Sequence, residues 1–164
     1  APAHLCFNDE SVTLITETSA GYPYFLQFIC REVFDIFIQQ VQQGDTPSVP
    51  ISSIVAKLDT DFFSGRWDRA TDRQRDLLCV IAQLGNDYEF SVAEVVAESK
   101  NAATKSFSPS HVSQMLSTLI NHGLVYKNRH GKYSFAVPLL GDYIRRKHVT
   151  YGPATWPFTI PTPV

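Results

Sequence analysis

SPSHVSQMLSTLINHGLVYKNRHGKYSFA, residues 108–136, decides the fold because its hydrophobic period changes part-way along. Ser108 can accept a hydrogen bond from the first free amides of a helix, and Pro109 suits the first helical position. Apolar residues then recur at the three- and four-residue spacing of one buried helix face. They are Val112, Met115, Leu116, Leu119 and Ile120. Gly123 supplies the left-handed position that ends this helix.

A two-stranded hairpin is predicted to follow the helix. Residues 124–127 are rich in β-forming side chains, residues 128–131 turn the chain, and residues 132–137 return it. From Pro138 a last helix is expected, which ends in the basic run 145–148, where cations suit the negative end of the helix dipole.

Two further helices are predicted before this stretch, each from a capping-box pattern. Thr71 is followed three residues later by Gln74, and Ser91 by Glu94. The resulting order over residues 66–148 is three helices, a hairpin and a helix, which is the order of a winged helix-turn-helix. We expect Trp67, at the start of this unit, to be a packed hinge residue.

Residues 1–65 predict a bundle of three helices. The first is capped by Asn8 or Asp9 and stopped by Gly21, the second begins at Pro23, and the third spans Ile51 to Phe62. The second helix is apolar around most of its circumference, so we expect neighbours to cover it on several sides. The predicted fold is therefore mainly α: a helical bundle, a winged helix with a small β-hairpin, and an extended proline-rich tail at 149–164.

Composition and charge narrow the function classes. The 164 residues are 44% hydrophobic, and no apolar run reaches the roughly 18 residues that span a bilayer, so no membrane contact is expected. Cys6, Cys30 and Cys79 are scattered and form no C-x-x-C pattern, which favours a reducing cytoplasm over a disulfide framework or a zinc site. Residues 1–99 hold 6 basic and 15 acidic side chains, whereas residues 100–164 hold 8 and 1. The basic second part indicates a surface for an anionic partner.

The phrase TSAGYPYFLQ, residues 18–27, resembles the start of the helical lid in prokaryotic ATPases of the AAA+ and STAND groups. In those proteins the lid closes over the nucleotide, and the resemblance implies that Gly21 and Pro23 lie near the adenine base. Tyr24 stands where many AAA+ lids have an arginine, so the STAND version is the better match. Two further phrases resemble the C-terminal domain of the same ATPases: RWDRATDRQRDLL, residues 66–78, and INHGLVYKNRHGKYSFAVPLLGDYIRR, residues 120–146.

This resemblance implies that the chain is the C-terminal piece of a longer P-loop ATPase. ATP or ADP with Mg²⁺ would then be a cofactor of the full-length protein, and the ATPase core would be a partner within the same polypeptide. No G-x-x-x-x-G-K-[ST] motif occurs in residues 1–164, so we expect no cofactor and no independent catalysis here.

DNA is the partner that the second unit predicts most directly. Polar side chains on the outer face of the 109–121 helix could reach base edges, and Gln114 could bond adenine bidentately. Cations before the helix and on the hairpin could contact phosphates. The predicted DNA-binding residues are Lys105, Ser110, His111, Ser113, Gln114, Ser117, Lys127, Arg129, His130 and Lys132.

Two other functions stay open. The same surface could be a protein-interaction or autoinhibitory module that contacts the ATPase core or a partner protein, and an independent transcription regulator would form a symmetric dimer. Catalysis and metal binding are not expected, because the five histidines show no H-x-x-x-H or H-E-x-x-H spacing. Asp59 and Asp61 alternate as a carboxylate pair could, but we expect both to face solvent near the end of a helix.

Overall fold

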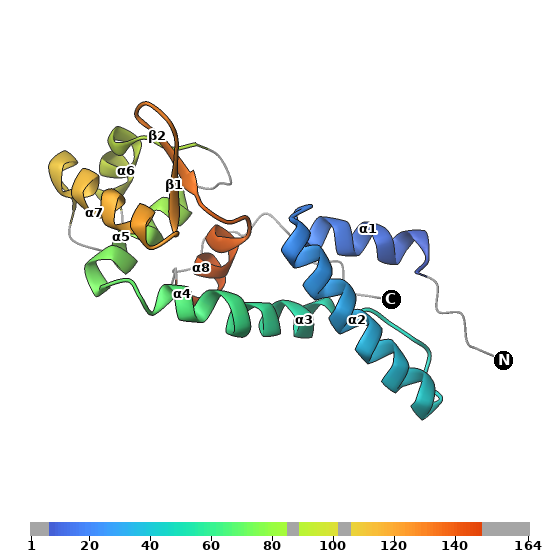
Figure 1. Cartoon of the computed structure of the whole chain (residues 1–164). Coiled ribbons are helices and arrows are strands. Elements are labelled where there is room, and N and C mark those ends of the chain that lie inside the picture. Colours follow the sequence, from blue (N-terminus) through green and yellow to red (C-terminus); the bar gives the residue numbers. More distant parts are fainter. Residues whose placement is uncertain (1–6, 85–88, 102–105, 149–164) are drawn as a thin grey trace.

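The computed structural model describes residues 7–84, 89–101 and 106–148, and Figure 1 shows their arrangement. These residues form a mainly helical protein with one small antiparallel hairpin, which confirms the predicted fold class. The predicted contact of Lys105 and the predicted tail at 149–164 lie outside the described residues. Within those residues no helix combines the length and apolar character needed to cross a membrane.

The first two helices meet at the corner that the sequence predicts. Helix α1 spans Asp9–Thr18, and the side chain of Asn8 caps it by accepting from the Ser11 amide at 2.8 Å. Gly21 has a φ of 66°, a left-handed value that glycine adopts without strain. Helix α2 spans Pro23–Gln43 with its proline in the first turn, so the predicted break and restart are confirmed.

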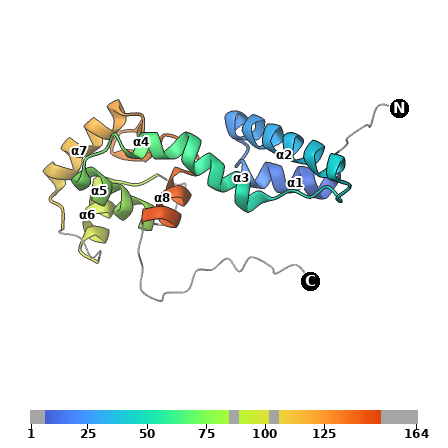
Figure 2. The same cartoon turned by 90° about the horizontal axis from the view of Figure 1, so that it is seen from below.

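A single long helical arm follows. Helix α3, Ile51–Leu58, continues without a break into a π-helical segment, η1, Asp59–Ser64, and then into α4, Gly65–Trp67. The backbone at both junctions stays right-handed helical. The third predicted helix therefore extends beyond Phe62. Figures 1 and 2 show this arm joining the α1–α2 pair to the remaining helices and the hairpin.

The next three helices begin at their predicted caps. Helix α5, Asp72–Gln83, and helix α6, Val92–Ser99, each open with a complete capping box. Helix α7, Pro109–Asn121, opens at Ser108, whose side chain accepts from the His111 amide at 3.4 Å. These boundaries were predictable because each cap acts on amides within three residues of itself.

The hairpin pairs β1, Val125–Arg129, with β2, Lys132–Phe135. Its register shifts between Lys127 and Arg129, where the strands are irregular. Phe90 adds an antiparallel bridge, because its amide donates to the Tyr133 carbonyl at 2.7 Å and its carbonyl accepts from the Tyr133 amide at 2.8 Å. This bridge brings the segment before α6 alongside the hairpin.

The last helix begins later than the sequence predicts. Helix α8 spans Leu140–His148 rather than starting at Pro138. Leu139 has a φ of 65°, and this left-handed backbone cannot be part of a right-handed helix. The basic residues of its last turn are placed as predicted.

One large hydrophobic core links the two ends of the arm. It extends from Phe25 of α2 through the arm to α5, α6, α7 and α8, and a smaller core gathers side chains of α1, α2 and α3. Phe63 lies at the centre of an aromatic group, with ring centroids 5.6 Å from Phe25 and 5.2 Å from Tyr143. Trp67 is 6% exposed, which confirms that it is packed.

The expectation that α2 is covered on several sides is wrong. Its fully buried positions form one stripe, at Phe25, Ile29, Val33 and Phe37. By contrast, Phe34 is 48% exposed and Val41 is 45% exposed. Helices α1 and α3 lie against this helix, and η1 packs on Phe25 at its start, but the side that carries Phe34 and Val41 is left in solvent.

Candidate functional site

The outer face of α7 presents polar side chains to solvent, as predicted. All five predicted positions on this helix are exposed. They are Ser110, His111, Ser113, Gln114 and Ser117. The Ser113 hydroxyl donates to the Pro109 carbonyl at 2.9 Å, so its oxygen is still able to accept a hydrogen bond. The helix itself contains no charged residue.

Helix α7 leads directly into the hairpin, so the predicted residues of both elements belong to one end of the fold (Figure 1). The Leu124 amide donates to the Leu119 carbonyl at 3.0 Å, and the Ala136 amide donates to the Leu124 carbonyl at 3.1 Å. These bonds fix the hairpin relative to the end of the helix. The polar row of α7 and the cations of the hairpin are therefore held on neighbouring elements.

Two of the predicted phosphate-binding cations are held in ion pairs. The Arg129 guanidinium donates to Glu89 through Nη2 at 2.7 Å and Nε at 3.0 Å, and Lys132 Nζ lies 3.3 Å from Glu94. The hydrogen bond from Arg129 lowers the pKa of the Glu89 carboxyl. The pKa of Glu94 is lowered mainly by its bonds with Ser91 and then by Lys132. Both carboxylates are thus charged at neutral pH and neutralise these two cations.

The other two predicted phosphate-binding residues of the hairpin are open to solvent. Lys127 and His130 are exposed, and no ion pair involves either of them among the described residues. Tyr126, next to Lys127, is 60% exposed. Glu89, Glu94 and Tyr126 were not predicted to belong to this surface. For Tyr126 the alternation of side chains along a strand is the signal that could have indicated its exposure.

The Gly21–Pro23 corner lies near the base of the hairpin. A hollow of about 280 Å³ opens beside it, lined by Ala20 on one side and by four residues of and after β2 on the other. These four are Ser134, Phe135, Val137 and Pro138. Neither Gly21 nor Pro23 lines this hollow, so the two residues act in the described structure as a helix stop and a helix start.

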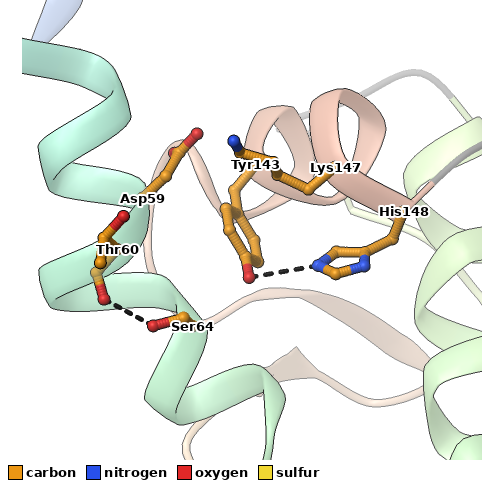
Figure 3. A pocket seen from close by; sticks show the side chains of 6 residues that line it. All are labelled: Asp59, Thr60, Ser64, Tyr143, Lys147 and His148. Atoms are coloured by element: carbon orange, nitrogen blue, oxygen red, sulfur yellow. Dashed lines mark hydrogen bonds between the residues drawn. The ribbon is translucent and has the colours of Figure 1, made fainter. Parts of the chain in front are cut away.

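A second hollow, of about 250 Å³, lies where the arm meets α8 (Figure 3). Its arm side is formed by η1 and its other side by the last two turns of α8. The six lining residues are Asp59, Thr60, Ser64, Tyr143, Lys147 and His148. π-Helical segments occur frequently at functional sites, and here the segment contributes Thr60 and Ser64, whose hydroxyls donate to carbonyls of their own helix.

The expectation that Asp59 faces solvent is wrong. Asp59 is only 2% exposed, and Arg146 pairs with it through Nη2 at 2.6 Å and Nε at 3.3 Å. The helical arm continues past Asp59 through η1, and α8 packs against η1 and covers the carboxylate. Asp61 is exposed as expected. The sequence could not reveal the ion pair, because its partners are 87 residues apart.

Tyr143 and His148 form the other polar contact of this hollow. The Tyr143 hydroxyl lies 3.2 Å from His148 Nε2, and the His148 ring stacks on Trp67 at a centroid distance of 4.0 Å. Burial, followed by the nearby charge of Asp59, raises the pKa of Tyr143. Burial, followed by the charge of Arg75, lowers the pKa of His148. Both groups are therefore uncharged at neutral pH, which suits a packed junction.

Comparison with known proteins places this architecture in a family. The matching family model covers residues 60–144, which is just over half of the chain. The chain belongs to the DUF8462 family. The family is described as a domain of unknown function. No curated protein and no solved structure matches the chain.

The DUF8462 segment contains the α7–hairpin surface and half of the residues that line the hollow between the arm and α8. It begins within η1 and ends within α8, so it includes α7, the hairpin and the aromatic junction around Phe63. In the part of the chain that the structure describes, no cluster of three histidine, cysteine, aspartate or glutamate side chains could hold a metal ion.

The lowered pKa of His148 predicts a pH-dependent stability. The folded protein favours neutral His148, so its contribution is fully present above the unfolded pKa near 6.5 and is lost as pH falls through the lower folded pKa. We expect the melting temperature of the wild type to fall between about pH 7 and pH 5 more steeply than that of His148→Phe, which can keep the Trp67 stack. Parallel pH profiles for the two proteins would contradict this assignment.

Proposed function

We propose that the α7–hairpin surface, residues 109–135, is a winged-helix module that binds duplex DNA. The observation that carries the proposal is the exposed, uncharged polar row of α7 held beside the hairpin. Such a row suits the major groove, where serine, histidine and glutamine can bond base edges. Lys127 and His130 would contact the backbone at one side of the helix. The binding step is non-catalytic.

The ion pairs of the hairpin define the strength of this interaction. Because Glu89 and Glu94 neutralise Arg129 and Lys132, the surface offers few unpaired cations for phosphates. Each phosphate contact contributes about −0.9 to the slope of log K against log salt. We therefore propose weak binding, with a slope of log K against log salt of about −2 to −3. This slope corresponds to phosphate contacts by Lys127 and one or two further cations.

The parent protein, in this proposal, is a P-loop ATPase of the AAA+/STAND type in the cytoplasm. The support is the resemblance of residues 18–27 to a nucleotide lid and the free thiols of Cys30 and Cys79. ATP or ADP with Mg²⁺ would bind to the full-length protein, and the 18–27 corner would close toward the base. The α7–hairpin module would be its DNA-binding part.

Titration of labelled duplex DNA tests the proposal. We expect Lys127→Ala to weaken binding, and Glu89→Gln with Glu94→Gln to steepen the salt slope by about 0.9 for each released cation that contacts a phosphate. Glutamine can replace glutamate in a capping box, so Glu94→Gln keeps the start of α6. Anisotropy at several salt concentrations measures both effects.

Lys57→Ala is the matched control, because Lys57 pairs with Glu32 in the first unit, away from α7 and the hairpin. Its salt slope should equal that of the wild type. Binding without salt dependence, or a slope that the two glutamine substitutions leave unchanged, would contradict the DNA proposal.

A second candidate is a protein-interaction or autoinhibitory module on the same surface. The observation that favours it is the neutralisation of Arg129 and Lys132, combined with the 60% exposed side chain of Tyr126. Tyrosine is enriched where proteins contact one another. In this case DNA titration would show no binding, and Tyr126→Ala would weaken association with the ATPase core.

A further inference from the structure

Helix α2 carries a second apolar stripe beside its buried one. Leu26 is 37% exposed, Phe34 is 48% exposed and Val41 is 45% exposed, and the partly buried Cys30 lies between them along the helix. The spacings of four, four and seven residues keep these side chains within about 80° of one another around the helix. The stripe therefore forms one continuous side of α2.

The exposed apolar side chains are concentrated in this part of the protein. Among the described residues, seven of the eight large exposed hydrophobic side chains lie in residues 7–44, and Tyr126 is the other. Val12 and Leu14 contribute to this group from α1. Concentrations of exposed apolar surface mark sites of protein association. The DNA-binding surface proposed for residues 109–135 does not account for them.

The charges around the stripe indicate the chemistry of its partner. Residues 7–44 contain five acidic side chains and a single basic one, Arg31; Glu32 is already paired with Lys57 of α3 at 2.7 Å, so the other four acidic side chains exceed Arg31 by three. The acidic residues are Asp9, Glu10, Glu17, Glu32 and Asp35. A second copy of the same face would place like charges opposite each other, which disfavours self-association. A basic partner would be attracted to this face.

We propose that the α2 stripe docks a basic amphipathic helix of a partner protein. Helix α2 has 21 residues and is about 31 Å long, which gives a partner helix several turns of contact. Anchors at three-, four- and seven-residue spacing are those that helices use to pack along a groove or another helix. Lysine or arginine on the flanks of the docked helix would face the acidic side chains of α1 and α2.

The test uses two synthetic helical peptides of about 21 residues, with leucine at three- and four-residue spacing and with either lysine or glutamate on the flanks. We expect the lysine peptide to bind the whole chain and the glutamate peptide not to bind. The double variant Phe34→Ser with Val41→Ser should weaken binding of the lysine peptide at least about tenfold. Calorimetric titration measures the affinities.

Gln39→Ser is the matched control, because Gln39 is exposed on the same helix but lies outside the stripe. It should leave the affinity for the lysine peptide unchanged. Equal binding of both peptides, binding that the double variant retains, or no binding at all would overturn the proposal. Sedimentation that shows a dimer of the wild type, lost in the double variant, would also overturn it by making a second copy the occupant. DNA titration of the double variant should match the wild type, so this proposal and the DNA proposal fail independently.

Discussion

Replacement of Phe63 by alanine is expected to lower the free energy of unfolding by about 3–5 kcal/mol. Phe63 is fully buried in η1, and its ring stacks on Tyr143 of α8. The same ring lies 5.0 Å from Phe62 and 5.6 Å from Phe25 of α2. Truncation would leave a cavity among aromatic rings held by three different elements, which cannot all move inward to fill it.

Phe34→Ala provides the comparison for this substitution. Phe34 is 48% exposed on α2, so its removal creates no enclosed cavity, and we expect a change below about 1 kcal/mol. Urea unfolding followed by circular dichroism measures both variants. If Phe63→Ala cost no more than Phe34→Ala, the shared aromatic core would not join the arm to α8.

The features that the sequence predicted correctly have local causes. Ser108 and Pro109 start α7, and Thr71 and Ser91 start α5 and α6, because each cap acts within one turn. The polar row of α7 followed from helical periodicity in the same way. These signals were sufficient for the mainly helical fold, the hairpin and the exposed side of α7.

The features that the sequence missed depend on residues far apart in the chain. Glu89 reaches Arg129, 40 residues away, because Phe90 bridges to Tyr133 and aligns the two segments. From the charge count alone, Arg129 was predicted to be free to contact a phosphate. The apolar circumference of α2 predicted neighbours on several sides. Periodicity, however, gives the polarity of each side of a helix and not the number of elements that pack against it.

Loss of Arg146 is expected to be more costly than loss of its partner, Asp59. The Asp59 side chain is 3% exposed, whereas the Arg146 side chain is 37% exposed. Arg146→Ala would leave a buried carboxylate without its cation, at a cost of about 3–5 kcal/mol. Asp59→Asn keeps a hydrogen-bond acceptor and leaves an arginine that water can reach, so about 1 kcal/mol is expected.

Lys147→Ala is the control, because Lys147 is an exposed neighbour on α8 and its loss should change stability by less than about 0.5 kcal/mol. The double variant Asp59→Asn with Arg146→Ala decides the mechanism. If the cost of Arg146→Ala comes from the stranded carboxylate, neutralising Asp59 should restore part of the lost stability. Additive losses in urea unfolding would instead mean that Arg146 acts through packing, and that the ion pair does not hold the arm to α8.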